Sequence, residues 1–182
     1  MSTYCEYCNT HAEDLFNKLY HDTQYGFPLK DDNLLFERLI LEINQAGLSW
    51  ITILRKADNF RKAYHDFNIA KVARYGEKDV TRLLNDAGII RNRLKVNAAI
   101  VNAQKILQLQ KEYGSFRDWL DSSHPLTKEE WTKLFKKTFV FTGGEIVNEF
   151  LMSTGYLPGA HEEGCHTYKR VASLRPAWMR RR

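Results

Sequence analysis

Apolar residues recur at helical spacing along nearly the whole chain, and this pattern constrains the fold more than any other feature of the sequence. In the segment that begins near Asn33, for example, Phe36, Ile40 and Ile43 fall on one stripe, as in an amphipathic helix. No run of useful length alternates between apolar and polar residues, which is the pattern of a half-buried strand. We therefore expect an all-α fold.

Capping residues and glycines indicate where the expected helices begin and end. Asp31 and Asp32 can cap the helix that begins near Asn33, and Gly88 can end one that starts at Asp79. Further helices are expected at about 53–64, 91–113, 131–135 and 144–151. We expect one domain of two helical lobes over residues 1–174, followed by a mobile basic tail at 175–182.

Composition excludes several classes of protein. The chain has 182 residues, 43% of them hydrophobic, which is enough for a core and excludes a disordered chain. The 27 Lys and Arg against 22 Asp and Glu leave a net charge of +5, which permits an acidic partner such as nucleic acid without requiring one. The apolar run from Ile43 to Leu54 is too short to span a membrane, and the N-terminus lacks the pattern of a signal peptide. Three cysteines cannot form a closed disulfide set, so a reducing cytoplasm is expected.

Cysteine and histidine gather at both ends of the chain. The first part holds Cys5, Cys8 and His21, and the last part holds His161 and Cys165, four residues apart. Two such pairs suffice for a tetrahedral zinc site that would join the termini. On this pattern alone Cys5-x-x-Cys8 is the natural N-terminal half, and the alternative hypothesis is a set of histidines and cysteines that bind no metal.

Two further segments could carry chemistry. Glu42 lies at the edge of its helix's apolar stripe, where a carboxylate is partly removed from water. Such a carboxylate either has a catalytic or binding function or pairs with a residue such as an arginine. Around Gly88 one helix ends and another begins, with Arg91, Arg93 and Lys95 close by. Backbone N–H groups and cations at such a turn can hold a phosphate, although a solvated basic face has the same pattern.

These segments together resemble the DNA-3-methyladenine glycosylase I family. The resemblance rests on Leu41-Glu42, Gln45-Ala46-Gly47-Leu48-Ser49-Trp50, Ala87-Gly88-Ile89-Ile90-Arg91-Asn92-Arg93, Tyr20-His21-Asp22 and His161-x-x-x-Cys165, and it runs from about Tyr4 to about Tyr168. It implies an all-α helix-hairpin-helix DNA glycosylase with one structural Zn²⁺ that joins the N- and C-terminal segments. It also implies base excision repair by a monofunctional, monomeric enzyme. Such an enzyme flips N3-methyladenine out of alkylated double-stranded DNA and hydrolyses its glycosidic bond, with free 3-methyladenine or adenine as product or ligand.

The resemblance also implies roles for individual residues. The zinc ligands correspond to His21, His161, Cys165 and either Cys5 or Cys8; we choose Cys5, because Tyr7 then matches an aromatic residue two places beyond the family's cysteine. The base pocket corresponds to Glu42 as the catalytic residue, with Tyr20, Trp50 and Tyr7 as substrate-binding residues. DNA would be held by Gly88, Arg91, Arg93 and Lys95.

The sequence departs from the family's pattern in several places. Asn17, Glu145 and Asn148 stand where the family has tyrosine, threonine and tyrosine, and Tyr25 stands where it has tryptophan. Glu145 can stabilise a helix N-terminus through the helix dipole, which we favour, or it can face the pocket and change lesion preference. A family member that binds lesions or free base without excision is therefore the alternative function.

Overall fold

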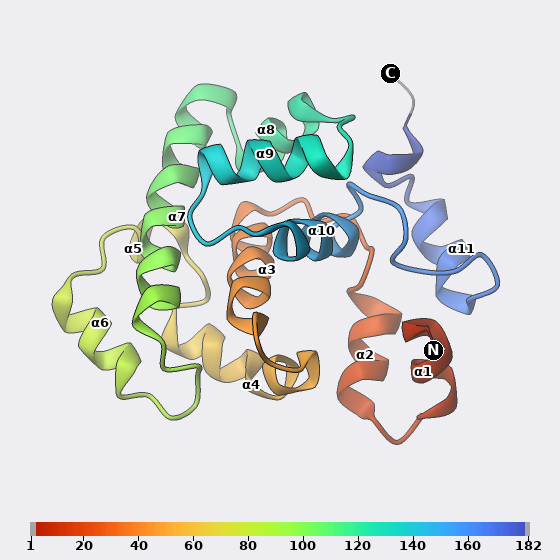
Figure 1. Ribbon diagram of the computed structural model, residues 1–182, viewed down its shortest axis with the longest axis horizontal. Helices are drawn as coiled ribbons and strands as arrows, with labels where there is room; N and C mark the ends of the chain where they lie inside the picture. Colours follow the sequence, from red (N-terminus) through yellow and green to blue (C-terminus); the bar gives the residue numbers. More distant parts are fainter. Residues whose placement is uncertain (1–2, 181–182) are drawn as a thin grey trace.

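The computed structural model describes residues 3–180 and contains, within that range, helices and the loops between them but no strand (Figure 1). The helices are α1 (Tyr4–Thr10), α2 (Leu15–Thr23), α3 (Asp32–Gln45), α4 (Trp50–Ala63), α5 (Ile69–Val72), α6 (Glu77–Leu84), α7 (Arg93–Tyr113), α8 (Phe116–Ser123), α9 (Lys128–Thr138), α10 (Gly144–Ser153), α11 (His166–Ser173) and the 3₁₀ turn η1 (Ala177–Met179). The expected all-α class is confirmed. No helix in the described range is long and apolar enough to cross a membrane.

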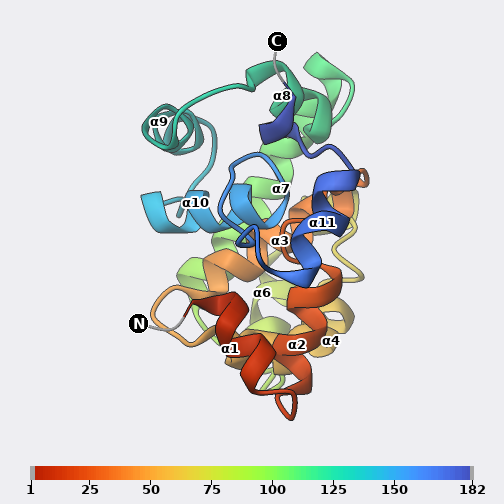
Figure 2. The same ribbon diagram turned by 90° about the vertical axis from the view of Figure 1, so that its right-hand side faces the viewer.

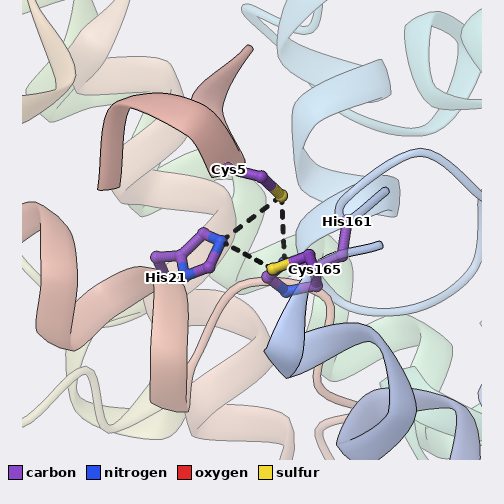
Figure 3. Close-up of side chains that lie close together, drawn as sticks. All are labelled: Cys5, His21, His161 and Cys165. Carbon is purple, nitrogen blue, oxygen red and sulfur yellow. Dashed lines mark hydrogen bonds between the residues drawn. The ribbon is translucent and has the colours of Figure 1, made fainter. Parts of the chain in front are cut away.

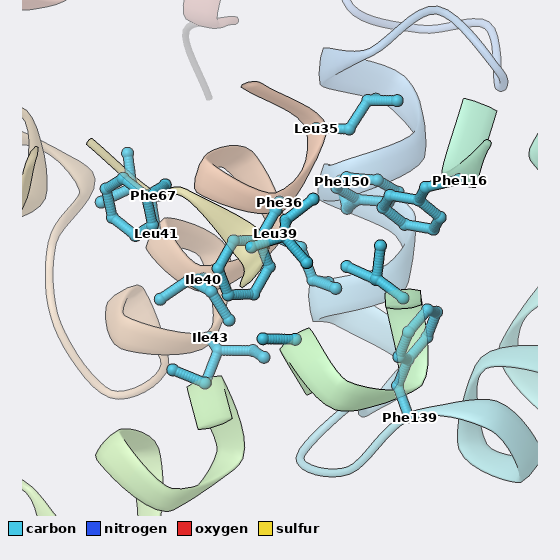
Figure 4. Packing of buried hydrophobic residues seen from close by; sticks show 14 of the residues in the cluster. Leu35, Phe36, Leu39, Ile40, Leu41, Ile43, Phe67, Phe116, Phe139 and Phe150 are labelled. Carbon is cyan, nitrogen blue, oxygen red and sulfur yellow. The ribbon is translucent and has the colours of Figure 1, made fainter. Parts of the chain in front are cut away.

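Helix α3 forms the centre of the molecule. It packs against α4, α7, α8 and α10, and Phe36, Ile40 and Ile43 are fully buried in the core that these helices share (Figure 4). The helix begins where the Asp31 side chain accepts a hydrogen bond from the Leu34 N–H group, and it ends before Gly47, whose φ of +81° suits glycine. Because α3 is surrounded, its polar residues are buried too, and each needs a partner or a function.

The two ends of the chain lie side by side. Figures 1 and 2 show α1 and α2 next to α11, on the side of α3 away from α5 and α6. Arg170 donates a hydrogen bond to the Asp22 carbonyl at 2.9 Å. Gly26 approaches the C-terminal segment so closely that a Cβ atom there would lie 2.8 Å from the Cβ of Ala160, and its φ is +79°. The turn after α2 therefore requires glycine, and it brings distant parts of the sequence together.

The expected tail is an exception to the predicted organisation. Pro176 and Ala177 are buried, and the Trp178 N–H group donates to the Gly155 carbonyl at 3.2 Å. The prediction of a mobile tail is therefore wrong for this segment, because its apolar residues pack onto the loop after α10. Arg181 and Arg182 lie outside the described residues. The division into two lobes stays a prediction.

Candidate active site and metal-binding cluster

A cavity of about 420 Å³ lies beside the C-terminal half of α3. Its lining comes from α1, α2 and the turn after it, α3, α4 and α10. The lining residues are Tyr4, Tyr20, Tyr25, Glu42, Gln45, Trp50, Glu145 and Glu149. Three of the four residues expected to hold the base, namely Glu42, Tyr20 and Trp50, are thus brought together.

Glu42 is buried in the wall of this cavity without a partner. Its exposed fraction is 4%, and its side chain makes no hydrogen bond or ion pair with any residue in the described range. Burial raises the pKa of the Glu42 carboxyl to about 8, with a further contribution from the negative charge of Glu149, while nearby Arg38 opposes the rise. The alternative in which Glu42 pairs with an arginine is wrong, because Arg38 donates to Tyr20 and not to Glu42. A buried, unpartnered acid beside a cavity indicates a function.

Aromatic rings surround this carboxyl group. The Tyr20 ring lies 5.1 Å from that of Trp50 and 5.6 Å from that of Tyr25, and the Tyr4 ring meets Tyr25 edge to face at 5.4 Å. Trp50 is the first residue of α4, and its buried Nε1–H group has no acceptor in the described range. The cavity therefore offers ring faces and unsatisfied polar groups to a planar, polar ligand.

Tyr7 does not line the cavity, so the prediction that it binds the base is wrong. Its ring stacks on His11 at 4.3 Å, and its hydroxyl donates to Asp14 at 3.0 Å. These contacts turn Tyr7 toward the loop between α1 and α2. The aromatic residue that α1 contributes to the cavity is Tyr4, for which the sequence analysis proposes no role.

Two departures from the family pattern lie near Tyr4 and at the cavity rim. Asn17 is buried and accepts a hydrogen bond from the Tyr4 hydroxyl at 3.0 Å, so it orients a lining residue. Glu145 stands in the first turn of α10 as favoured, and it also lines the rim. Its side chain is 87% exposed and pairs with Lys128 at 3.3 Å. Asn148 does not line the cavity, and its amide contacts the sulfur of Met152.

Glu149 is a lining residue that sequence reasoning missed. One turn beyond Glu145 on α10, it is partly buried and accepts a hydrogen bond from the Tyr25 hydroxyl at 3.2 Å. Burial raises the pKa of its carboxyl. A signal for it is present in the sequence, since Glu149 interrupts the apolar face of Ile146, Val147 and Phe150.

Four buried side chains from the two ends of the chain form a second site (Figure 3). Their donor atoms, one each from Cys5, His21, His161 and Cys165, all lie within 4.8 Å of one another. The four sulfur-to-nitrogen distances are 3.4, 3.5, 3.7 and 4.0 Å. A tetrahedral zinc ion with ordinary bond lengths requires about 3.6 Å. The cluster thus has the donor types and the dimensions of a zinc site.

The hydrogen bonds behind this cluster fix its histidines. His21 Nδ1 lies 2.7 Å from the Asp22 carboxylate, and His161 Nε2 lies 2.7 Å from the Tyr25 carbonyl. Because these acceptors take the N–H of each ring, the other ring nitrogen faces the cluster with a free lone pair. Burial lowers the pKa of both histidines, which keeps them neutral. This is the arrangement that metal-binding histidines use.

The structure separates the two N-terminal cysteines. Cys5 belongs to the cluster, whereas the thiol of Cys8 faces the Asn17 carbonyl at 3.7 Å and lies outside it. Burial raises the pKa of the Cys5 thiol to about 11, so a bound cation would be needed to hold it as the thiolate. Of the two candidates, Cys5 is the one placed to bind a metal.

The loop between α6 and α7 and the first turn of α7 carry the residues expected to hold DNA. Arg91 is exposed and has no ion pair in the described range, and exposed Arg93 pairs with Glu77 at 3.1 Å. The Gly88 N–H group donates to the side chain of Asp86 at 2.7 Å, so this N–H is already satisfied.

The prediction that Lys95 holds DNA is also wrong, because this residue is buried. It is 5% exposed, and its Nζ donates to the carbonyls of Asn44 and Ala46, each at 2.8 Å. Burial lowers its pKa. Lys95 therefore ties α7 to the C-terminal end of α3 instead of facing solvent, because its carbonyl partners lie where the loop between α3 and α4 begins.

Comparison with known proteins gives consistent matches. Residues 10–133 match a family model described as methyladenine glycosylase. The chain is 37% identical to DNA-3-methyladenine glycosylase 1 of Escherichia coli (strain K12), over 90% of this chain and 97% of that protein. It is 36% identical to DNA-3-methyladenine glycosylase of Haemophilus influenzae, over 75% and 84%. The structure of 3-methyladenine DNA glycosylase I from Staphylococcus aureus, which describes recognition of 3-methyladenine, matches with a TM-score of 0.78 at 33% identity, over 88% of this chain and 95% of that one.

Proposed function

Because the chain belongs to the methyladenine glycosylase family, we infer that it hydrolyses the N-glycosidic bond of N3-methyladenine in alkylated DNA, as a base excision repair enzyme. The cavity around Glu42 is the site of the flipped base. The observation that carries this assignment is the buried Glu42 carboxyl, which has no protein partner and lies among the rings of Tyr20 and Trp50. A base taken out of the duplex needs such a pocket, because it loses its stacking and its hydrogen bonds.

The chemistry follows from the charge of the lesion. A 3-methylated adenine in DNA carries a positive charge, so it is attracted to a carboxylate and to electron-rich ring faces. It is also a good leaving group. The positive charge of the bound base lowers the pKa of Glu42 and so favours its ionised form. Glu42 then accepts hydrogen bonds from the base edge, and its negative charge stabilises the positive charge that develops toward the sugar in the transition state. Among the described residues, no lysine lines the cavity. Water is therefore the nucleophile, and the enzyme forms no Schiff base.

The cluster of Cys5, His21, His161 and Cys165 is a structural Zn²⁺ site in this proposal. A bound ion would join α1 and α2 to the segment before α11, and with four protein ligands it would have no open position for catalysis. The ion therefore contributes stability. Its effect on the base is indirect, since Tyr20 and His21 are neighbours on α2.

The segment from α6 to α7 is the helix-hairpin-helix element that holds double-stranded DNA. Support comes from the exposed Arg91 and Arg93, which lie at the start of α7. Lys95 ties this element to the end of α3. The distance and orientation between the phosphate-binding loop and the base pocket are thereby held fixed. We expect the protein to act as a monomer in the cytoplasm.

The test is release of 3-methyladenine from methylated DNA by the wild-type protein and by Glu42→Gln. We expect release by the wild type and a loss of at least a hundredfold in the variant, the size typical of removing one positioned electrostatic group. Glu129→Gln, at an exposed residue of α9 outside the cavity lining, is the matched control and should retain activity. Absence of release by folded wild-type protein would refute the assignment. Tight binding of lesion DNA without release would instead support the alternative of a binding module.

A further inference from the structure

Three charged side chains surround the hydroxyl group of Tyr20. Arg38 and Glu42 lie one turn apart on α3, and Glu149 approaches from α10. All three act electrostatically on Tyr20. Arg38 is 6% exposed and Glu42 is 4% exposed, while Glu149 is partly buried. Buried charges are costly unless other charges or hydrogen bonds compensate them.

Arg38 uses its donors on neutral groups. Its guanidinium donates to the Tyr20 hydroxyl and to the Ser153 carbonyl, each at 3.2 Å, and lies 5.0 Å from the centre of the Tyr20 ring. In the described range no carboxylate lies within 4.0 Å of it. Arg38 thereby joins α3 to α10 and orients a ring that lines the cavity. Its charge is not cancelled by a direct partner.

Glu149 likewise has no ion pair within 4.0 Å among the described residues, and Lys128 acts on it only from a greater distance. Its carboxyl group is held by the neutral Tyr25 hydroxyl. The other glutamate of α10, Glu145, pairs with Lys128 at the exposed rim, where solvent screens both charges. Above the Glu42 pKa of about 8, the uncompensated charges of the described residues at the cavity are therefore the carboxylates Glu42 and Glu149, together with the Arg38 cation beside Tyr20.

We propose that Arg38 and Glu149 together set the net charge of the cavity to one negative charge, and that this makes the cavity selective for a base with a single positive charge. Glu149 is the specificity-determining residue, since it lines the cavity. Arg38 is a positioning residue that acts through Tyr20 and offsets one carboxylate. The inference rests on the proposed function and deepens it by naming the residues of this chain that set its preference for a cationic base.

Counting charges in the complex gives a distinct expectation for each variant. With a cationic base bound, the wild-type cavity is neutral. Glu149→Gln leaves one excess positive charge, Arg38→Met leaves one excess negative charge, and the double variant is neutral again. The double variant should therefore recover what Glu149→Gln loses, although it removes a second buried side chain. A purely structural role for either residue predicts the opposite, namely that the two losses accumulate.

The experiment uses two small probes of the same shape. One is the 3,9-dimethyladeninium ion, in which a methyl group replaces the sugar and the positive charge is permanent. The other is 3,9-dimethyl-3-deazaadenine, in which carbon replaces N3 and the ring is neutral. Isothermal titration of the whole protein at pH 9, where Glu42 is ionised in wild type and variants, gives the ratio of the two dissociation constants. This ratio reports charge selectivity separately from shape. Thermal unfolding of each variant reports folding.

We expect wild type to prefer the cation, and Glu149→Gln to lower this preference about tenfold, the effect of one charge several ångströms away at the effective dielectric of a protein. The double variant should return to within about twofold of the wild-type ratio. Arg38→Lys keeps the charge and should keep the ratio. The control Glu129→Gln, at an exposed residue of α9 outside the cavity lining, should not change it. An unchanged ratio in Glu149→Gln overturns the proposal, and so does a double variant that stays as low as Glu149→Gln.

The proposal can be tested even if one of the variants does not fold. If Arg38→Met unfolds, Glu149→Gln and Arg38→Lys still decide the proposal. Failure of the two proposals is distinguishable as well. A protein that prefers the cation but releases no base from DNA contradicts the proposed function alone, whereas release of base by a protein without charge preference contradicts this inference alone.

Discussion

Replacing Glu42 with glutamine should stabilise the protein at high pH while removing its activity. Burial raises the pKa of this carboxyl from 4.5 to about 8. Below pH 4.5 the group is protonated in both the folded and the unfolded protein, so it costs nothing. Between pH 4.5 and 8 the unfolded chain releases the proton and the folded protein keeps it, so stability falls as pH rises. Above pH 8 the folded protein bears the full cost of a buried charge.

The size of this cost follows from the difference in pKa. At about 1.4 kcal/mol for each pH unit, the cost reaches about 3 kcal/mol at pH 7 and about 5 kcal/mol above pH 8. Glutamine has nearly the same shape but no charge, so Glu42→Gln lacks the unfavourable free energy of a buried charge, which increases with pH. The difference in unfolding free energy between the variant and the wild type should therefore increase by about that amount from pH 4.5 to pH 8.

Urea denaturation of both proteins at pH 5, 7 and 9 measures this difference. Other titrating groups, the cysteines and histidines of the metal-binding cluster included, are the same in both proteins, so their contributions cancel. Any fixed cost of burying the amide shifts all three values equally. A difference that does not change with pH would refute the reasoning, since it would mean that Glu42 is ionised in the folded protein at all three values.

Other expectations test the remaining parts of the structure. Arg91→Ala and Arg93→Ala should each weaken binding to DNA of any sequence and lower the slope of log affinity against log salt by about one, measured by fluorescence anisotropy. Lys95→Met should cost about 1–3 kcal/mol of stability in urea, because two buried carbonyls lose their donor, and a change in salt slope without loss of stability would contradict it. Cys5→Ser should lose bound zinc in metal analysis, and Cys8→Ser should retain it; the reverse result would refute the ligand set.

The central helix shows how far sequence reasoning reaches. The spacing of Phe36, Ile40 and Ile43 predicts α3, and the observed helix runs from Asp32 to Gln45. The helices expected at about 53–64, 79–87, 91–113, 131–135 and 144–151 are present, and the observed ones run over 50–63, 77–84, 93–113, 128–138 and 144–153. Helices α1, α2, α5, α8 and α11 were not anticipated. Each has nine residues or fewer, which is too short for an apolar period to repeat with certainty.

The errors at the site have a common cause. Tyr7 and Tyr4 lie on the same short helix, and no local pattern says which of them faces a cavity formed by α2, α3, α4 and α10. Lys95 was placed with two arginines because all three are cations near one turn, but its partners are carbonyls of Asn44 and Ala46, about fifty residues earlier in the chain. Periodicity gives the direction of a side chain about its own helix axis. It does not say which distant helix lies in that direction.

By itself, the sequence determined the helical class, the unusual position of Glu42 and the pairs of cysteine and histidine at the two ends, because each depends on local spacing and residue chemistry. The tertiary structure decided that Cys5 joins the metal-binding cluster and that Lys95 is buried. It also decided that Glu42 and Glu149 line one cavity, with Arg38 bound to the Tyr20 hydroxyl beside it. The physical reason is that burial and charge interactions depend on packing between segments more than a hundred residues apart. Arg38 and Ser153 are one such pair, 115 positions apart in the chain and 3.2 Å apart in the fold.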